Sequence, residues 1–96
     1  MKPTAYLINT SRGPIVDEQA LFTILKNHKI AGAAIDVYSQ EPIPADHPFL
    51  SLGNVLLTPH LGYVTADSLS NAYGEAVEDV RAFLAGKPIR VLGTTW

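Results

Sequence analysis

Four side chains that could take part in acid–base or charge-pairing chemistry follow three apolar runs of the sequence. They are Arg12 in "TSRGP", Asp36 and Glu41 in "DVYSQEP", and His60 in "TPHLG". An arginine fork matches a carboxylate with two parallel hydrogen bonds, and histidine exchanges a proton near neutral pH. A nearby carboxylate, for which Glu41 is the candidate, would fix the ring tautomer and favour the charged imidazole. The chemistry that needs these groups together is carbonyl reduction or its reverse.

Each of these residues also has a purely structural interpretation. Arg12 and Glu41 can be solvated loop charges, and Asp36 can cap a loop at a strand end. A hydrogen-bonded, half-buried histidine at position 60 would be commoner than a catalytic one. All four residues, however, follow consecutive predicted strands, and ligands of open parallel sheets bind beyond the carboxyl ends of the strands. Their convergence at one sheet edge favours a site.

The other two histidines are interpreted as structural. His28 stands at the C-terminal end of a predicted helix, where positive charge is favoured. His47 is expected to be an exposed loop residue. The three histidines do not have the spacing of H-x₃₋₅-H or HExxH motifs, and the sequence contains no cysteine. We therefore predict no metal site.

The apolar patterns predict the order strand, helix, strand, loop, strand, helix. Strands are expected over residues 5–9, 31–38 and 54–58, and helices over 17–29 and 65–85. Asp17 suits the N-cap of the first helix, and Gly86 suits the end of the second. The first strand is expected to be buried on both faces, and one short strand is expected within 87–96. This order predicts part of a parallel α/β sheet.

The composition narrows the possible classes of protein. With 96 residues, 47% hydrophobic and 17% charged, the chain can form one small domain with a packed core and is not expected to be disordered. A net charge of −2 gives no general attraction to nucleic acid or to membranes. No segment has the features of a signal peptide, and none reaches the ~20 apolar residues of a membrane span. The cysteine-free composition fits a reducing compartment, so we expect a cytoplasmic protein.

Three blocks of the sequence carry a family resemblance. "INTSRGPIVDEQAL", "IAGAAIDVYSQEPIP" and "NVLLTPHLGYVT" closely resemble the C-terminal part of the NAD-dependent D-2-hydroxyacid dehydrogenases, which include phosphoglycerate dehydrogenase and the glyoxylate/hydroxypyruvate reductases. The resemblance implies the C-terminal portion of a doubly wound parallel-sheet (Rossmann) NAD-binding domain plus a long C-terminal helix. Residues 1–64 would then be the second half of that domain. Residues 65–96 would be the helix and tail that return to the substrate domain.

The resemblance also implies catalytic roles. Arg12 matches the arginine that holds the substrate's carboxylate and carbonyl, His60 matches the acid/base, and Glu41 matches its carboxylate partner. The implied reaction is hydride transfer between NAD(H) and a small D-2-hydroxy acid or 2-keto acid. By family, the chain is therefore expected to be part of an oxidoreductase, and we expect a homo-oligomer without nucleic-acid or membrane partners.

A second set of residues matches the family's cofactor positions. Thr10 and Ser11 correspond to residues on the nicotinamide side of the cofactor cleft. Asp36 corresponds to the aspartate near the nicotinamide carboxamide, and Gly62 corresponds to the backbone that closes over this carboxamide. Arg12 and His60 belong to this set as well as to the catalytic one.

One family feature is missing from the sequence. The dinucleotide fingerprint G-x-G-x-x-G needs glycines two residues apart, and none of the seven glycines is so spaced. We therefore expect the chain to correspond to the last third of such an enzyme and to be inactive in isolation. The alternative is a folded but catalytically inert module that only self-associates, through the apolar stripe of the long helix.

Overall fold

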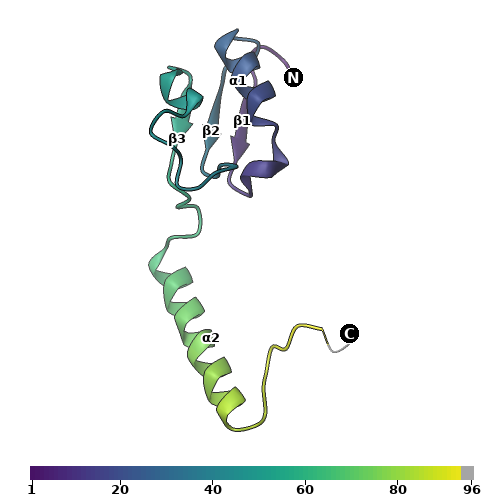
Figure 1. Cartoon of the computed structure of the whole chain (residues 1–96), viewed down its shortest axis with the longest axis vertical. Coiled ribbons are helices and arrows are strands. Elements are labelled where there is room, and N and C mark those ends of the chain that lie inside the picture. Colours follow the sequence, from purple (N-terminus) through teal and green to yellow (C-terminus); the bar gives the residue numbers. More distant parts are fainter. Residues whose placement is uncertain (94–96) are drawn as a thin grey trace. The chain divides into compact units, whose positions relative to one another are not determined.

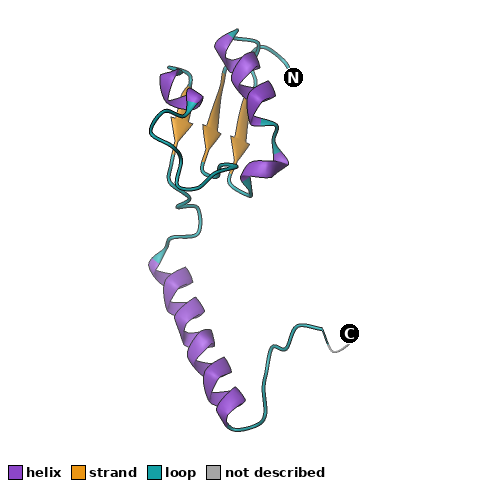
Figure 2. Cartoon of the chain, viewed as in Figure 1, coloured by secondary structure: helices purple, strands orange, loops and turns teal. Residues whose placement is uncertain are grey.

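A computed structural model describes residues 1–93 of the protein, which divides into two compact units, Met1–Gly62 and the chain from Tyr63 onward (Figures 1 and 2). The first unit is a three-stranded sheet with one α-helix and two short 3-10 helices. The second, as far as residue 93, contains a single long helix. The elements in chain order are β1 (Tyr6–Asn9), η1 (Gly13–Ile15), α1 (Glu18–Lys26), β2 (Gly32–Ile35), η2 (Pro48–Ser51), β3 (Val55–Leu57) and α2 (Ala66–Leu84).

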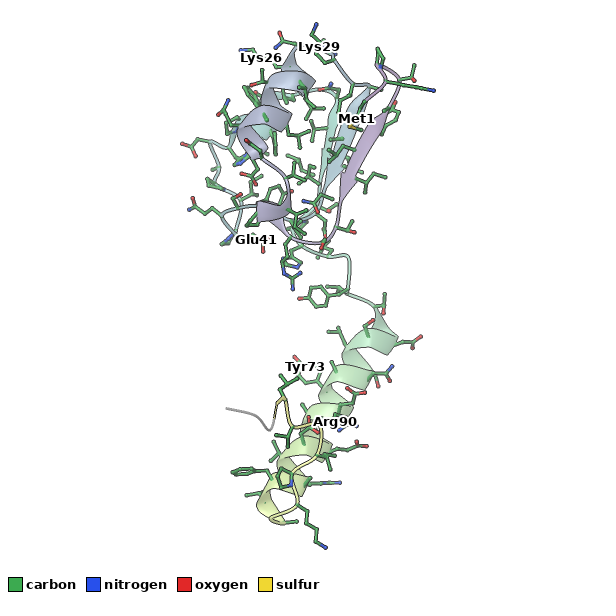
Figure 3. The ribbon with its side chains drawn as sticks, turned by 90° about the vertical axis from the view of Figure 1, so that its right-hand side faces the viewer. Met1, Lys26, Lys29, Glu41, Tyr73 and Arg90 are labelled. Carbon is green, nitrogen blue, oxygen red and sulfur yellow. The ribbon has the colours of Figure 1, made fainter. Side chains whose placement is uncertain are left out.

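The three strands are all parallel, in the order β1-β2-β3. Ile35 of β2 lies opposite Asn9 of β1 and Leu57 of β3, so the strands end together. The predicted parallel α/β arrangement is confirmed. Figure 3 shows Glu41 at the end of the first unit where the strands finish, with Lys26 and Lys29 at the other end.

Helix α1 begins and ends by local hydrogen bonding. The predicted N-cap is confirmed, because the Asp17 side chain accepts a hydrogen bond from Ala20 N at 2.9 Å. The helix ends at Lys26, three residues earlier than predicted. His28 adopts the left-handed conformation, with φ 49°, and Lys29 N donates to the Ile24 carbonyl. This is the Schellman termination, with a histidine where glycine is usual.

The core lies on one face of the sheet. Leu21 and Leu25 of α1 pack with Ile35 of β2 and Phe49 of η2, and all four side chains are buried. The prediction that the first strand is buried on both faces is wrong. Tyr6 and Ile8 are each 70% exposed, because the side chains of α1 and η2 cover only the opposite face in the described chain.

Helix α2 matches its prediction to within the two cap residues. Thr65 caps it by accepting from Ser68 N at 3.1 Å, and Gly86, with φ 70°, follows the C-cap. None of its residues is buried. Within the described part of the chain, no helix has both the length and the apolar character needed to cross a bilayer.

The tail after α2 does not form the predicted strand within residues 87–93, and residues 94–96 lie outside the described part. Pro88 lacks an N–H for a strand ladder, and Arg90 has φ 52°, which is not an extended conformation. The Arg90 guanidinium instead bonds to Glu78 at 2.8 Å and to Asp79 at 2.7 Å, which holds this part of the tail to α2.

Gly13 is expected to be irreplaceable by alanine. A Cβ at this position would overlap the Tyr38 carbonyl group and the Ser39 nitrogen, which are backbone atoms and cannot turn aside. We expect Gly13→Ala to lower the free energy of unfolding by ~1–3 kcal/mol, as overpacking does. Urea unfolding measures the effect. The control is Gly53→Ala, where no atom lies within 4 Å; equal losses in the two variants would contradict the prediction.

Candidate active site

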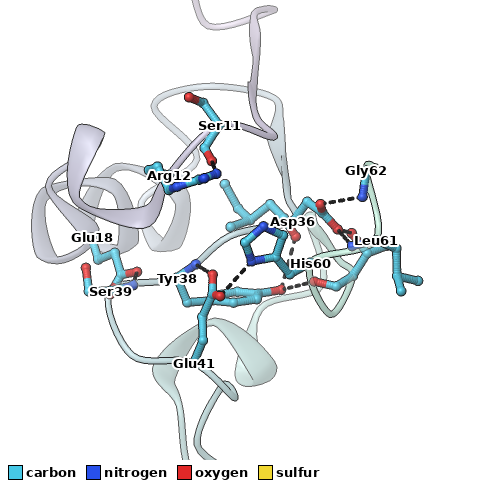
Figure 4. Close-up of polar contacts among 12 residues, drawn as sticks. Ser11, Arg12, Glu18, Asp36, Tyr38, Ser39, Glu41, His60, Leu61 and Gly62 are labelled. Atoms are coloured by element: carbon cyan, nitrogen blue, oxygen red, sulfur yellow. Dashed lines mark hydrogen bonds and ion pairs between the residues drawn. The ribbon is translucent and has the colours of Figure 1, made fainter. Parts of the chain in front are cut away.

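His60 and Glu41 form a close pair beyond the carboxyl ends of the strands (Figure 4). His60 Nδ1 lies 2.6 Å from Glu41 Oε2, and each side chain is 34% exposed. The other carboxylate oxygen of Glu41 accepts from Tyr38 N at 2.9 Å. The hydrogen bond with His60 lowers the pKa of the Glu41 carboxyl, and the Tyr38 N–H and the charge of Arg12 lower it further. The pairing fixes the orientation of the imidazole ring.

Asp36 holds the loop that carries His60. The residue is only 5% exposed, and its carboxylate accepts hydrogen bonds from the Thr58 hydroxyl and from Leu61 N and Gly62 N, the last two at 2.8 Å. His60 itself has φ 59°, in the left-handed region. The Thr58 hydroxyl and then the Leu61 N–H are the main causes of the lowered pKa of Asp36. Asp36 is therefore an acceptor that holds the Thr58 side chain before His60 and the backbone directly after it.

The turn that carries Arg12 is organised by Asn9, which sequence reasoning did not single out. The side chain of Asn9 is buried; its Nδ2 donates to the Arg12 carbonyl at 3.0 Å, and its Oδ1 accepts from Ser11 N at 3.1 Å. The Arg12 guanidinium is exposed and donates to the Ser11 carbonyl at 2.7 Å. An asparagine directly before a turn is a recognisable sequence signal, because its side chain commonly bonds to backbone two residues on.

The predicted cofactor residues lie at the same edge. A Cβ built on Gly62 would stand 3.1 Å from Asp36 Oδ2 and 3.8 Å from Thr10 Cβ, so these three residues are neighbours. Ser11 lies beside Arg12 through the hydrogen bond described above. The structure thus places Thr10, Asp36 and Gly62 together, and it places His60 and Glu41 together within reach of the charge of Arg12. The catalytic and cofactor roles assigned to these residues stay predictions.

His47 is not the exposed loop residue that was predicted. Its side chain is 13% exposed, with Nε2 3.6 Å from Glu18 Oε2. Its Nδ1 accepts from Phe49 N at 3.3 Å, and the two rings are 4.9 Å apart. Glu18 also accepts from Ser39 N at 2.7 Å. The side chains of Glu18 and His47 therefore link α1 to the loop that contains Glu41. Local sequence patterns do not predict such a long-range contact.

The fold and the polar edge define a class of protein. A parallel sheet with side chains gathered beyond its carboxyl ends is the architecture of Rossmann-type dinucleotide-binding domains. Residues 1–62 match the family model described as "D-isomer specific 2-hydroxyacid dehydrogenase, NAD binding domain". The chain belongs to this family, and the resemblance and fold class predicted from the sequence are confirmed.

Individual relatives agree with the family match. Glyoxylate/hydroxypyruvate reductase B of Enterobacter agglomerans is 48% identical over 87 residues, covering 91% of this chain and 27% of the relative. The structure of D-lactate dehydrogenase with NAD+ from Lactobacillus jensenii is 33% identical, with a TM-score of 0.83 over 99% of this chain and 32% of that one. An NADPH-dependent glyoxylate/hydroxypyruvate reductase from Sinorhizobium meliloti is 36% identical, with a TM-score of 0.80 over 91% of this chain and 28% of that one. The chain therefore spans about a third of these relatives or less.

Asp36→Asn is expected to destabilise the protein at neutral pH. An amide has two donors and a single acceptor oxygen, so it cannot accept from Thr58, Leu61 and Gly62 together. The pKa of Asp36 in the folded protein lies below its ordinary value of 3.8. Its stabilising contribution is therefore complete above that ordinary value and is lost as the pH falls through the folded-state pKa.

Urea midpoints of the unchanged protein and the Asp36→Asn variant at pH 7 and at pH 3 test this expectation. The difference between the urea midpoints of the two proteins should be large at pH 7 and smaller at pH 3. Asp46→Asn, in an exposed loop, is the matched control and should follow the unchanged protein at both pH values. A difference between the midpoints that does not change with pH would contradict the assignment of the three hydrogen bonds to an ionised carboxylate.

Proposed function

We propose that this chain supplies the acid/base part of a site for hydride transfer between NAD(H) and a small D-2-hydroxy acid or 2-keto acid. The observation that carries the proposal is the 2.6 Å contact between His60 Nδ1 and Glu41 Oε2 at the carboxyl edge of the sheet. Its support from relatives is the family match of residues 1–62. The names of similar proteins favour glyoxylate or hydroxypyruvate as the substrate class.

In the proposed reaction, His60 exchanges a proton with the substrate oxygen. Because Nδ1 is directed at Glu41, the exchanged proton is the one on Nε2. On reduction the imidazolium gives this proton to the oxygen that becomes the hydroxyl, and on oxidation the neutral ring takes it back. Glu41 stabilises the imidazolium, which is the charged form that must be present before reduction.

Arg12 is proposed to hold the substrate's carboxylate. A guanidinium has five N–H donors in a planar fork, so Arg12 can keep its bond to the Ser11 carbonyl and still engage a carboxylate with a pair of donors. This would orient the substrate's carbonyl towards His60. The positive charge of Arg12 already acts at this place, since it contributes to the lowered pKa of Glu41.

The cofactor edge is proposed to consist of Thr10, Ser11, Asp36 and Gly62, together with Arg12 and His60. When bound, NAD supplies or accepts the hydride. The residues fit such a group: Asp36 fills three of the roughly four acceptor positions of a carboxylate, which leaves capacity on Oδ2 for an amide N–H. We propose NAD over NADP on the family resemblance, although similar proteins include an NADPH-dependent one.

We further propose that residues 1–64 are the second half of the cofactor domain and that residues 65–96 serve the substrate domain. The family model ends at residue 62 and α2 begins at Ala66, which supports this boundary. A cytoplasmic location is proposed as well, because the composition, free of cysteine, suits a reducing compartment.

A chimera tests the proposed function. In it, this chain replaces the matching segment of the Enterobacter agglomerans reductase, with which it is 48% identical. We expect the chimera to reduce glyoxylate with NADH or NADPH. His60→Asn should lower kcat by about 10²–10⁴, the usual contribution of a general acid or base. Asparagine tolerates the left-handed conformation that His60 adopts, so the backbone is preserved.

His28→Asn in the same chimera is the matched control. It makes the same substitution at a histidine that is also in the left-handed region, since φ is 49° at His28 and 59° at His60. His28 follows the C-terminal end of α1, away from the site. Its rate should equal that of the unchanged chimera. The proposal is refuted if His60→Asn leaves kcat unaltered in a chimera that reduces glyoxylate.

Self-association of the chain is a second candidate function, favoured by the apolar surface of α2. Six large apolar side chains of this helix are exposed, namely Leu69, Tyr73, Val77, Val80, Phe83 and Leu84. Exposed apolar surface on this scale commonly marks a contact site. We propose that α2 mediates a homo-oligomer, as the family resemblance also led us to expect.

Val80→Lys is expected to weaken the proposed oligomer. Val80 is an exposed member of the apolar stripe of α2, and a lysine there would place a charge in the contact. Sedimentation equilibrium should find the unchanged chain larger than a monomer and the variant shifted towards the monomer by tenfold or more in dissociation constant, about 1.4 kcal/mol. Asn71→Lys, on the other side of the helix, should leave the mass unchanged. A monomeric unchanged chain would rule the proposal out.

A further inference from the structure

We propose that Tyr38 is a positioning residue for the His60–Glu41 pair, acting through the hydrogen bond of its hydroxyl to the Thr58 carbonyl. The catalytic meaning of this role rests on the function proposed above. The contacts themselves belong to a residue that neither the sequence motifs nor the family resemblance singled out.

Tyr38 contacts Glu41 at one end and the segment that precedes His60 at the other. Its backbone N–H donates to Glu41 Oε1 at 2.9 Å. Its hydroxyl oxygen lies 2.9 Å from the Thr58 carbonyl oxygen and 3.0 Å from that of Ile35. Thr58 precedes His60 with only Pro59 between them. One residue therefore links the two loops, bonding to Glu41 through its backbone N–H and to Thr58 through its hydroxyl; Figure 4 shows Tyr38 beside Glu41 and His60.

The hydroxyl acts where the sheet can no longer fix the chain. Strand β3 ends at Leu57, and Thr58 N still donates to the Ile35 carbonyl at 3.0 Å. The next residue, Pro59, has no N–H to donate. The Tyr38 hydroxyl supplies a bond on the carbonyl side of Thr58, so Thr58 is held through both its N–H and its carbonyl group. The backbone is therefore fixed at Thr58, two residues before His60.

The tyrosine ring is itself held firmly. Tyr38 is 4% exposed and belongs to the buried core cluster with Ile35 and Phe49. The ring of His47 contacts it edge-on, with centroids 6.1 Å apart. Burial raises the pKa of the Tyr38 hydroxyl, which keeps it protonated as a donor. A firmly packed ring places its hydroxyl at a defined point, which is what a positioning role needs.

The same ring forms a wall beside the pair. A cavity of about 340 Å³ is lined by Tyr38, Glu41, Pro42, Ile43, Pro59 and His60. Phenylalanine at position 38 would keep this wall and the packing, and would remove only the hydroxyl. The Thr58 carbonyl would lose its donor, and leaving a carbonyl oxygen without a hydrogen bond costs free energy, which favours a shift of this segment towards water. The loop to His60 would then be free to drift from Glu41.

Tyr38→Phe therefore separates positioning from packing, and the titration of Glu41 reports the difference. The groups that act on this carboxylate are His60, through a hydrogen bond and its charge, the Tyr38 N–H, and the charge of Arg12. The backbone N–H survives the substitution. If the His60 contact loosens, the strongest cause of the low pKa of Glu41 weakens, and that pKa rises towards its ordinary value.

The experiment follows the Glu41 side-chain carboxyl by ¹³C NMR during an acid titration of the 96-residue chain. We expect the Glu41 midpoint to shift upward in Tyr38→Phe and to stay in place in Tyr6→Phe. The control removes the same atom from an exposed tyrosine of β1. A Tyr38→Phe chain that melts at a lower temperature with its Glu41 midpoint unmoved would overturn the proposal, because Tyr38 would then only add stability.

A measurement on the unchanged chain covers the case in which Tyr38→Phe does not fold. A buried hydroxyl that donates to Thr58 should give a slowly exchanging proton resonance with a coupling to the Thr58 carbonyl carbon. Rapid exchange or the lack of that coupling would overturn the proposal. Neither measurement uses cofactor or substrate, so a failure here is distinct from a failure of the glyoxylate assay.

Discussion

The common direction of the three strands is the constraint on which the candidate site depends. Because β1, β2 and β3 are parallel and in register, Asn9, Ile35 and Leu57 finish side by side. The segments that follow them are then delivered to one edge of the sheet, although they lie far apart along the chain. A reversed strand would carry its loop to the opposite end, where Lys26 and Lys29 lie (Figure 3). Arg12, Glu41 and His60 could not meet in such a sheet.

Within this edge, carboxylates complete the backbone hydrogen bonding that the strands leave unfinished. Beyond the last ladder pair, each N–H must find another acceptor. Asp36 serves Leu61 and Gly62, Glu41 serves Tyr38, and Glu18 serves Ser39. The negative charges of the edge are therefore structural as well as chemical. This dual use explains how exposed loops of a small unit can hold a histidine in a fixed orientation.

The sequence predicted the elements well because the signals involved are local. Asp17 as a cap and the apolar runs of the strands depend on residues a few positions apart, and the ends of α1 and β2 differed by only three residues. The convergence of Arg12, Glu41 and His60 followed from topology, and their roles from the family resemblance. The exposed face of β1 was missed, because an apolar pattern does not say whether another segment covers it.

The contacts that support the site were also beyond local sequence reasoning. His47 was taken for a surface residue, since nothing near it reveals that Glu18, at the start of α1, reaches the same loop. The Tyr38 hydroxyl bonds to a carbonyl 20 residues away, and Glu18 bonds to Ser39 across 21. A backbone carbonyl has no sequence signature at all. Such partners become visible only when the strands are placed beside one another.

The separation between Glu41 and His60 has a consequence for the order in which the molecule folds. The two residues are 19 positions apart, and the bonds from Asp36 to Leu61 and Gly62 span 25 and 26. Closing loops of this length costs entropy before any contact offsets it. Helix α1 can form early from local contacts, whereas the pair must await the docking of β3 on β2. Local unfolding of β3, which has only three residues, would then separate His60 from Glu41 while the rest of the first unit remains folded.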